Sequence, residues 1–247
     1  MRIPAVPPAP TVAQHGFTLV ELAIVMFIVA LLLGGMLLPL SAQQDIRARL
    51  ETEKNLGDIR DALLGYGIIN GYLPCPAPVD LSTNGVESSR DGNGACPIRV
   101  GLLPWTTLGL GRNDSWNHYF RYSVTPAFSN SGTGTGAKFS TSSAGDITIR
   151  TRDSSGNLQT LAANVPAAVV SHGAFGAWAY SAAGSQIADS ANLNTDEDTN
   201  GNDAAGTSFV SRTPSPQGAA APGEFDDLVV WLPTNTLVNR LTAAGKL

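Results

Sequence analysis

The sequence predicts an α+β protein in which one long N-terminal helix packs on a small antiparallel sheet of about four strands. Two observations support this prediction. An uncharged apolar run from Leu22 to Gln44 is followed by apolar residues spaced three and four apart up to Ile69, which is the period of a helix. Beyond residue 117, short segments alternate between apolar and polar residues, which is the period of a strand.

The composition is that of one globular domain attached to an apolar segment. The chain has 247 residues, of which 14% are charged, with 26 glycines and 16 prolines. This balance excludes a disordered polyelectrolyte. The formal net charge is −5, and the sequence holds no basic stripe of the kind that binds nucleic acid. Nucleic acid is therefore not an expected partner.

Residues 1–16 differ from a secretory signal peptide in the order of their parts. A signal peptide places its apolar stretch first and a small residue at the cleavage site after it. Here the small residue, Gly16, precedes the apolar run, and the residues before it are rich in proline. Proline disfavours a helix because it lacks an amide proton and clashes with the preceding turn.

Residues 17–44 are predicted to form a transmembrane helix. About 20 apolar residues, at roughly 1.5 Å per residue, cross the hydrocarbon core of a bilayer. Glu21 lies near the start of this segment. A carboxylate in an apolar helix costs on the order of 3 kcal/mol and is by default a functional candidate. The alternative is that Glu21 merely extends toward the lipid headgroups.

The junction at residues 16–22 is GFTLVEL, and it resembles the type III signal of type IV pilins and type II secretion pseudopilins. It combines a glycine directly before a phenylalanine, a glutamate four residues after it, and an apolar helix. The resemblance implies a pilin-like fold, a leader at residues 1–16, cleavage by prepilin peptidase between Gly16 and Phe17, and methylation of the new amine of Phe17. It also implies that Glu21 directs assembly by pairing with the Phe17 amine of a neighbouring subunit.

The resemblance also implies a location, partners and a function. The chain is expected in the bacterial inner membrane as a single-pass protein with its C-terminal domain in the periplasm, and then in a pilus or pseudopilus. The implied partners are other pilin or pseudopilin subunits, prepilin peptidase, an inner-membrane assembly platform and the lipid bilayer. The implied function is that of a structural subunit, and the chain length favours a minor one. The alternative is a membrane-anchored periplasmic binding domain that does not polymerise.

Residues 45–71 are predicted to continue the helix with one apolar face. The apolar positions are Ile46, Leu50, Leu56, Ile59, Leu63 and Tyr66. Glycines near residue 70 and Pro74 end the helix. The stripe is expected to pack on the sheet.

Residues 72–117 are predicted to form a loop region, which pilins call the αβ-loop. The segment is rich in proline and lacks periodicity, and it holds both cysteines of the chain, Cys75 and Cys96. A disulfide between them is the simplest interpretation, and it implies an oxidising compartment. Two separate buried thiols are the alternative.

Residues 118–247 are predicted to hold the sheet and long surface loops. The expected strands are His118–Thr125, Asp146–Arg152, Ala167–Ser171 and Asp227–Leu232. The expected loops are Ser129–Gly136 and Ala182–Gly223. The chain then ends in a short helix, capped by Thr234 or Asn235, that buries Leu237, Val238 and Leu241.

Calcium is the one cofactor for which the sequence offers candidate ligands. Residues 196–201, DEDTNG, match the opening of an EF-hand loop, in which Asp196, Asp198 and Asn200 would supply oxygens. The twelfth loop position is Thr207 rather than glutamate, so a solvated turn is the alternative. Asp226 and Asp227 are further candidates by resemblance to major pseudopilins, in which such residues flank a calcium loop.

No sequence pattern indicates an enzyme. The chain lacks the G-x-S-x-G elbow of hydrolases and the H-E-x-x-H helix of zinc proteases. Its three histidines are far apart in the sequence. We therefore expect a protein without catalytic residues.

Overall fold

The computed structural model describes residues 16, 18–82, 84–189, 194–202 and 204–247, with the backbone alone at residues 34–42. The predicted leader lies outside the described residues except for Gly16, and Phe17 also lies outside them. The chain divides into two compact units, residues 1–45 and residues 46–247, and each is described by itself.

Helix α1 (Leu19–Asn70) begins in the first unit and ends in the second. Leucine and alanine, which favour helices, are frequent along it. It stops before Gly71, whose φ of +75° suits glycine at a helix end. Among the described residues, no helix is both long enough and apolar enough to cross a membrane, so the span predicted at residues 17–44 is not confirmed.

The second unit contains a four-stranded antiparallel sheet, as the sequence predicts. Its strand order is β1-β3-β6-β9. The strands are β1 (Val100–Leu102), β3 (Arg121–Val124), β6 (Ala167–Ser171) and β9 (Leu228–Leu232). The register places Tyr122 opposite both Gly101 and Val169. The α+β class with an N-terminal helix is therefore confirmed.

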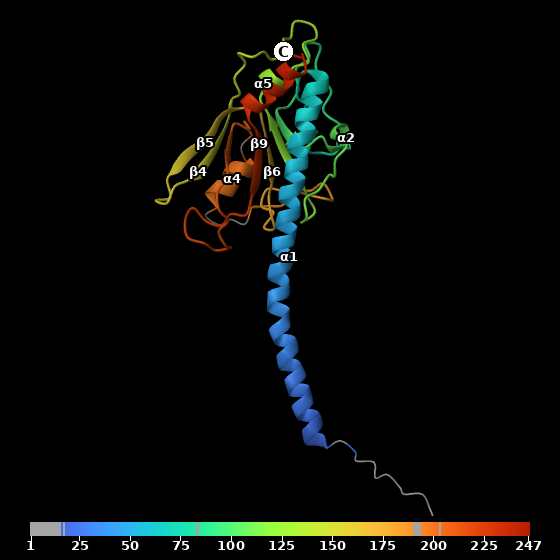
Figure 1. Cartoon of the computed structure of the whole chain (residues 1–247), viewed down its shortest axis with the longest axis vertical. Coiled ribbons are helices and arrows are strands. Elements are labelled where there is room, and N and C mark those ends of the chain that lie inside the picture. The colour runs from blue at the N-terminus through green and yellow to red at the C-terminus, as the bar shows by residue number, and fades with distance from the viewer. Residues whose placement is uncertain (1–15, 17, 83, 190–193, 203) are drawn as a thin grey trace, which may run out of the picture. The chain divides into compact units, whose positions relative to one another are not determined.

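Strand β6 is buried on both faces, which makes the second unit a three-layer structure. Ala167 and Val169 belong to the core that includes α1, whereas Ala168 and Val170 belong to a second core on the opposite face. A strand covered on both sides has an uninterrupted apolar sequence rather than an alternating one. Figure 1 shows α1 on one side of β6 and β9, and β4 and β5 on the other.

The layer opposite α1 is a three-stranded sheet in the order β5-β4-β8. Its strands are β4 (Ile147–Arg152), β5 (Leu158–Val165) and β8 (Ser208–Val210), and β8 runs parallel to β4. The prediction that residues 146–152 join the four-stranded sheet is wrong. Ile147 and Ile149 instead pack with Val170 in the core on the face of β6 opposite α1. Their place in the sheet is taken by β1, which is too short to show alternation.

Several short elements lie within segments that the sequence assigned to loops. Residues 72–117 contain β1 and helix α2 (Trp105–Leu108). The predicted loop Ser129–Gly136 is preceded by helix α3 (Pro126–Ser129). Strands β2 (His118–Tyr119) and β7 (Tyr180–Ser181) form a separate pair.

The predicted surface loop Ala182–Gly223 needs a larger correction, because it contains helix α4 (Thr195–Asn202) and strand β8. Asn194, Glu197 and Asn200 are buried there. Their side chains are paired by hydrogen bonds, which allows a polar sequence to be buried.

The stripe of α1 that packs on the sheet is shorter than predicted. Leu56, Ile59 and Leu63 are between 2% and 4% exposed, whereas Ile46 and Leu50 are each 59% exposed. The sheet therefore covers the helix only from about Thr52 onward, where the Thr52 hydroxyl accepts a hydrogen bond from the Ser115 amide.

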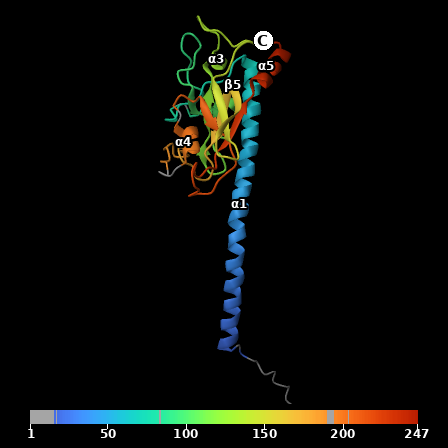
Figure 2. The same cartoon turned by 90° about the vertical axis from the view of Figure 1, so that its left-hand side faces the viewer.

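Helix α5 (Thr234–Ala243) confirms the predicted C-terminal helix and the burial of Leu237 and Leu241. The predicted cap is wrong, because Pro233 occupies the N-cap position and the Thr234 hydroxyl donates to the Asn164 carbonyl. In both views α5 lies beside the C-terminal end of α1 (Figures 1 and 2). Gly67 permits this approach, since its missing Cβ would lie 3.3 Å from Leu237.

Leu63→Ala should destabilise the second unit, because Leu63 is 2% exposed in the core between α1 and the sheet. We expect the free energy of unfolding to fall by about 2–5 kcal/mol, as measured by denaturant unfolding of the full chain. Leu158→Ala on β5 is the matched control, because Leu158 is 42% exposed and its loss should change stability by less than about 0.5 kcal/mol. Equal effects of the two substitutions would contradict this packing.

Candidate functional site

The predicted cleavage site has open space around it. Gly16 is exposed, and a Cβ added there would meet no heavy atom of the described residues within 4 Å. Phe17, the predicted methylation site, lies outside the described residues. Because glycine has no Cβ to restrict its dihedral angles, Gly16 can take the extended conformation that a protease binds.

Glu21 is bound by Thr18 in a capping box at the start of α1. The Thr18 amide and hydroxyl both donate to Glu21 Oε2, at 2.9 and 3.0 Å, and the Glu21 amide donates to Thr18 Oγ1 at 3.2 Å. In such a box, two residues three positions apart satisfy each other's polar groups at the open end of a helix. Thr18 is not among the site residues predicted from the sequence, although the T-x-x-E spacing before an apolar run is the signal that identifies it.

The capping box gives the Glu21 carboxylate hydrogen bonds but no opposite charge. No ion pair involves Glu21 among the residues that the structure describes. Thr18 and Glu21 are both exposed, so a cation from another molecule can reach them. A cation that binds an unpaired carboxylate in an apolar helix stabilises it.

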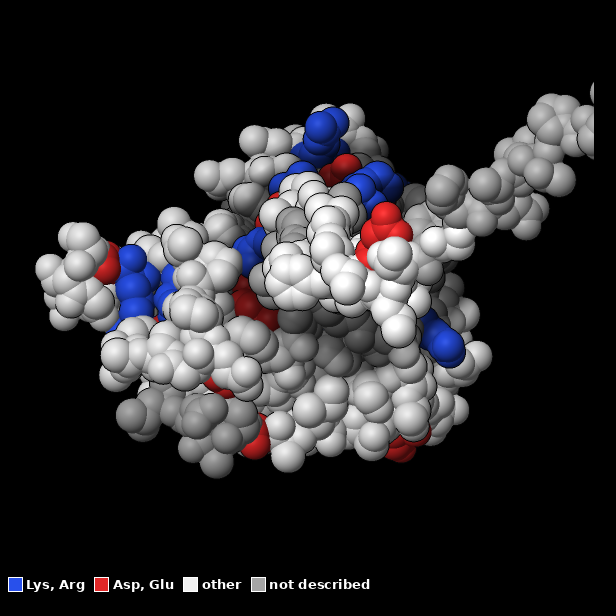
Figure 3. Space-filling model, turned by 90° about the horizontal axis from the view of Figure 1, so that it is seen from below, with Lys and Arg blue, Asp and Glu red and all other residues white. Residues whose placement is uncertain are grey.

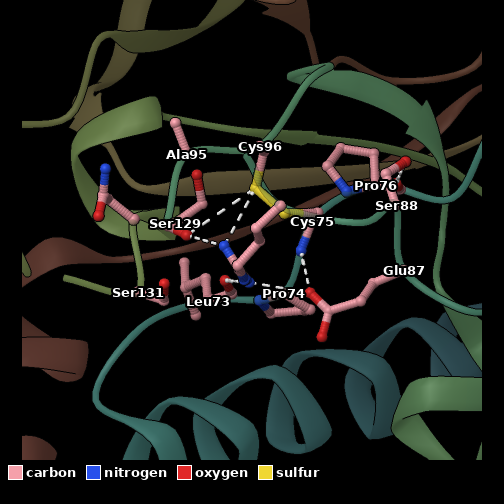
Figure 4. Close-up of a disulfide and its surroundings, with 12 residues drawn as sticks. Leu73, Pro74, Cys75, Pro76, Glu87, Ser88, Ala95, Cys96, Ser129 and Ser131 are labelled. Carbon is pink, nitrogen blue, oxygen red and sulfur yellow. Dashed lines mark hydrogen bonds and ion pairs between the residues drawn. A yellow bond between two sulfur atoms is a disulfide. The ribbon is translucent and has the colours of Figure 1, made fainter. Parts of the chain in front are cut away.

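The structure contains the predicted disulfide between Cys75 and Cys96, with an S–S distance of 2.05 Å (Figure 4). Beside it, Arg90 donates to the carbonyls of Leu73 and Ser129 and pairs with Glu87 at 2.8 Å. The disulfide therefore joins two parts of the predicted αβ-loop, and Arg90 binds this loop to Ser129, in the segment after β3.

Glu87 extends this network to α1. Its carboxylate accepts hydrogen bonds from the Cys75 amide at 2.8 Å and from the Tyr66 hydroxyl at 2.7 Å. Burial, with a further contribution from Glu87, raises the pKa of Tyr66, so the hydroxyl keeps its proton and remains a donor. The loop is thereby attached to the last turns of the helix.

The structure does not bring the predicted EF-hand ligands together, because residues 195–202 form helix α4. Asp196 pairs with Arg152 and Arg212 at 2.7 and 2.6 Å. Asp198 accepts a hydrogen bond from the Trp178 indole at 3.0 Å. Asn200 bonds to the backbone of Val210.

A different set of carboxylates does converge. Glu197, Asp226 and Asp227 each place one oxygen within 4.8 Å of the others, and they form what we call the carboxylate cluster. Asp226 and Asp227 are two of the candidates from the sequence. Glu197 was missed because it occupies a non-ligand position of the EF-hand pattern. The sequence signal that could have identified Glu197 is the spacing of Asn194, Glu197 and Asn200. This spacing places three polar side chains on one helix face.

Each member of the carboxylate cluster is held by a neighbour. Glu197 accepts hydrogen bonds from the Asp226 amide at 3.0 Å and from Asn194 at 3.1 Å. Asp227 is bound by Asn200 at 2.8 Å and lies 3.3 Å from His172 Nδ1. The oxygens are therefore fixed in position by the surrounding structure.

Burial makes the charged form of the carboxylate cluster unfavourable. It raises the pKa of Glu197 to about 8, with a further rise from the charge of Asp227. Burial also raises the pKa of Asp226 to about 7, although the hydrogen bond from the Phe175 amide opposes this shift. The raised pKa values of Glu197 and Asp226 favour a bound proton or a bound cation near neutral pH.

The donor set of the cluster fits a divalent cation. Oδ1 of Asp226 and Oδ1 of Asn194 are buried without a hydrogen-bond partner among the described residues. Calcium binds carboxylate and amide oxygens of this type. On the face in Figure 3, acidic and basic side chains lie in small groups with uncharged surface between them, and the described residues form no extended patch of one sign there.

One comparison with known proteins gives a match. Residues 12–37 match the family model for the prokaryotic N-terminal methylation motif, which is the signature of the type IV pilin and pseudopilin signal. Gly16, Phe17, Thr18 and Glu21 all lie within the match. Comparisons with curated proteins and with solved structures gave no match.

The stability of the metal-free chain should decrease as the pH rises. A carboxyl group whose pKa is higher in the folded state stabilises that state below its unfolded pKa, and the contribution is lost as the pH rises through the folded pKa. The folded-state pKa is about 8 for Glu197 and about 7 for Asp226, so the loss of stability extends to these pH values. With a chelator present, the melting temperature should fall between about pH 5 and about pH 8.5, and added calcium should restore it at the higher pH.

Glu197→Gln provides the comparison for this experiment, because it keeps the shape of the side chain and cannot ionise. It should flatten the pH profile and remove the effect of calcium, whereas Asp61→Asn, whose side chain is 73% exposed, should change neither. A calcium effect that persists in Glu197→Gln would show that the ion binds elsewhere.

Proposed function

We propose that the chain is a structural subunit, of the minor class, in a type IV pilus or type II secretion pseudopilus. The observation that carries the proposal is the match of residues 12–37 to the methylation motif. The motif indicates a pilin-like or pseudopilin substrate of prepilin peptidase, and proteins with this signature are structural rather than catalytic. The capping box at Thr18 and Glu21 lies within the matched segment.

Processing is the first step of the proposed function. Prepilin peptidase cleaves after Gly16 and methylates the amine of Phe17, and the open space around Gly16 supports its access. Cleavage removes residues 1–16 and places a cationic amine on Phe17, four residues before Glu21. The new positive charge and the carboxylate then lie on the same short segment.

The proposed location is the inner membrane, with the C-terminal unit in the periplasm. The segment from Leu22 to Gln44 contains no charged residue, and the side chains of residues 34–42 within it are not among those described. The Cys75–Cys96 disulfide supports a compartment that is oxidising.

Assembly rests on an exchange of partners at Glu21. In the single chain the carboxylate is bound by Thr18. In the filament the methylated amine of a neighbouring Phe17 supplies the opposite charge, and a charge pair in an apolar environment is tolerated when both members are matched. The neighbouring subunits and the assembly platform are the partners in this step.

The cation held by the carboxylate cluster is proposed to be calcium, which stabilises the periplasmic unit.

Intact-mass measurement tests the processing step. The protein extracted from membranes should begin at Phe17 and carry one added methyl group, because the matched motif directs both reactions. Gly16→Val should block cleavage, since the added side chain would occupy the space that glycine leaves beside the scissile bond for the protease. A wild-type protein that retains Met1 would contradict this proposal and favour a membrane-anchored binding domain that does not polymerise.

Glu21→Ala tests the assembly step. The variant should be cleaved and inserted as in the wild type, but should not enter filaments, because the neighbouring amine loses its charge partner. Filament incorporation is measured in sheared fractions. Glu53→Ala is the matched control, since Glu53 is an exposed carboxylate on the same helix that already pairs with Arg49 of its own chain. Normal incorporation of Glu21→Ala would refute the pairing.

A further inference from the structure

The second unit contains a cavity of about 250 Å³. Three aromatic side chains, Tyr119, Trp178 and Tyr180, line it together with Arg121 and His172. Ligand cavities in proteins combine apolar and aromatic walls with a few polar groups that orient the ligand. The volume is below the roughly 300–1,000 Å³ of cavities for drug-sized molecules, so it suits a single ring.

Trp178 is held in a backbone conformation that tryptophan rarely adopts. Its φ is +65°, a region that favours glycine. Backbone strain of this kind persists where the surrounding structure imposes it, and it is found most often at binding and catalytic sites. Here the indole donates to Asp198 at 3.0 Å, and Gly201 packs so closely that its Cβ would lie 2.2 Å from that of Trp178. The tryptophan is therefore fixed against the cavity.

The other two aromatic walls differ in how firmly they are held. Tyr119 is 3% exposed and stacks on Trp105, with ring centroids 5.1 Å apart and an interplanar angle of 22°. Its position is set by that stack. Tyr180 is half-buried in the short strand β7 and contributes a ring and a hydroxyl. The cavity thus has two fixed rings and one more exposed ring.

The polar walls have a defined orientation as well. His172 is 2% exposed, and its Nδ1 lies 3.3 Å from Asp227 Oδ1. This contact fixes the imidazole plane, so that the ring lines the cavity in one orientation. Arg121 adds a guanidinium with several donors in one plane. Donors and aromatic faces therefore meet in one enclosed space.

We propose that this cavity binds a pyranose sugar unit. One face of a pyranose carries C–H bonds that pack on an aromatic ring, and its rim carries hydroxyl groups that need hydrogen-bond partners. In this cavity, Trp178 and Tyr180 supply aromatic rings for the C–H face. Arg121 and His172 supply hydrogen-bonding groups for the hydroxyls. A purely apolar ligand fits poorly, because it offers no hydrogen-bonding group to the polar wall that Arg121 and His172 form. A phosphorylated ligand fits poorly too, since Arg121 is the only Lys or Arg among the described lining residues.

The test is a fluorescence titration of the full chain with glucose, galactose, N-acetylglucosamine, galacturonic acid and, as a planar aromatic anion, benzoate. Because Trp178 lines the cavity, at least one of the sugars should produce a saturable change in tryptophan emission. Binding of galacturonic acid alone would assign a carboxylate to Arg121 and still support a sugar site. No saturation with any sugar, or saturation with benzoate alone, would overturn the proposal.

Two variants and a control separate the cavity from general effects. Trp178→Gly removes the ring while glycine accepts φ of +65° without strain, and it should weaken sugar binding by about tenfold or more, as measured by titration calorimetry because the fluorescent reporter is lost. Tyr180→Phe keeps the fold and the ring, removes the hydroxyl, and should weaken binding by a smaller factor. Trp231→Phe, in strand β9 and outside this cavity, should bind as the wild type does. Unchanged binding in both cavity variants would place the sugar elsewhere and refute the assignment.

Discussion

The contact between α1 and the four-stranded sheet is the interaction on which the second unit depends. Leu56, Ile59 and Leu63 present one narrow stripe, and β6 lies behind it with both faces buried. Because β6 is covered on its other side by β4, the same strand joins the two hydrophobic cores. His172 directly follows β6 and Asp227 directly precedes β9, so the polar network begins at the ends of these two strands.

The same helix serves a different purpose at its other end, where Thr18 and Glu21 form the capping box. A helix start has amide groups that lack partners within the helix, and a carboxylate at this position satisfies one of them. The box makes Glu21 tolerable in the single chain without neutralising its charge. In the proposed filament the charge itself becomes useful, because it attracts the amine that processing creates at Phe17.

The polar side chains of the second unit form a connected interior rather than isolated surface loops. Asp227 contacts both His172 and Asn200, and Asn200 lies on the same helix as Glu197. His172 faces the aromatic cavity, while Asp227 belongs to the carboxylate cluster. The two candidate sites of the second unit thus share one hydrogen-bonded pair, so that a cation in the cluster would bear on the orientation of the imidazole in the cavity.

The sequence by itself determined the features that depend on residues close together in the chain. The helix through residue 70, the sequence signal at residues 16–22, the C-terminal helix and the strands at β3, β6 and β9 follow from local period and composition. The pairing of Cys75 with Cys96 followed because the chain has only two cysteines. Thr18 could also have been identified, since the spacing of a capping box is visible in the sequence.

Only the tertiary structure decided which distant groups meet. Sequence spacing assigned Asp196, Asp198 and Asn200 to one loop, yet each has a different partner, and Glu197 joins Asp226 and Asp227 instead. Strand β4 has clear alternation, but alternation does not say which of two layers a strand enters. The physical reason is that periodicity records which face of an element is buried, whereas the identity of the covering group depends on long-range packing that no local pattern contains.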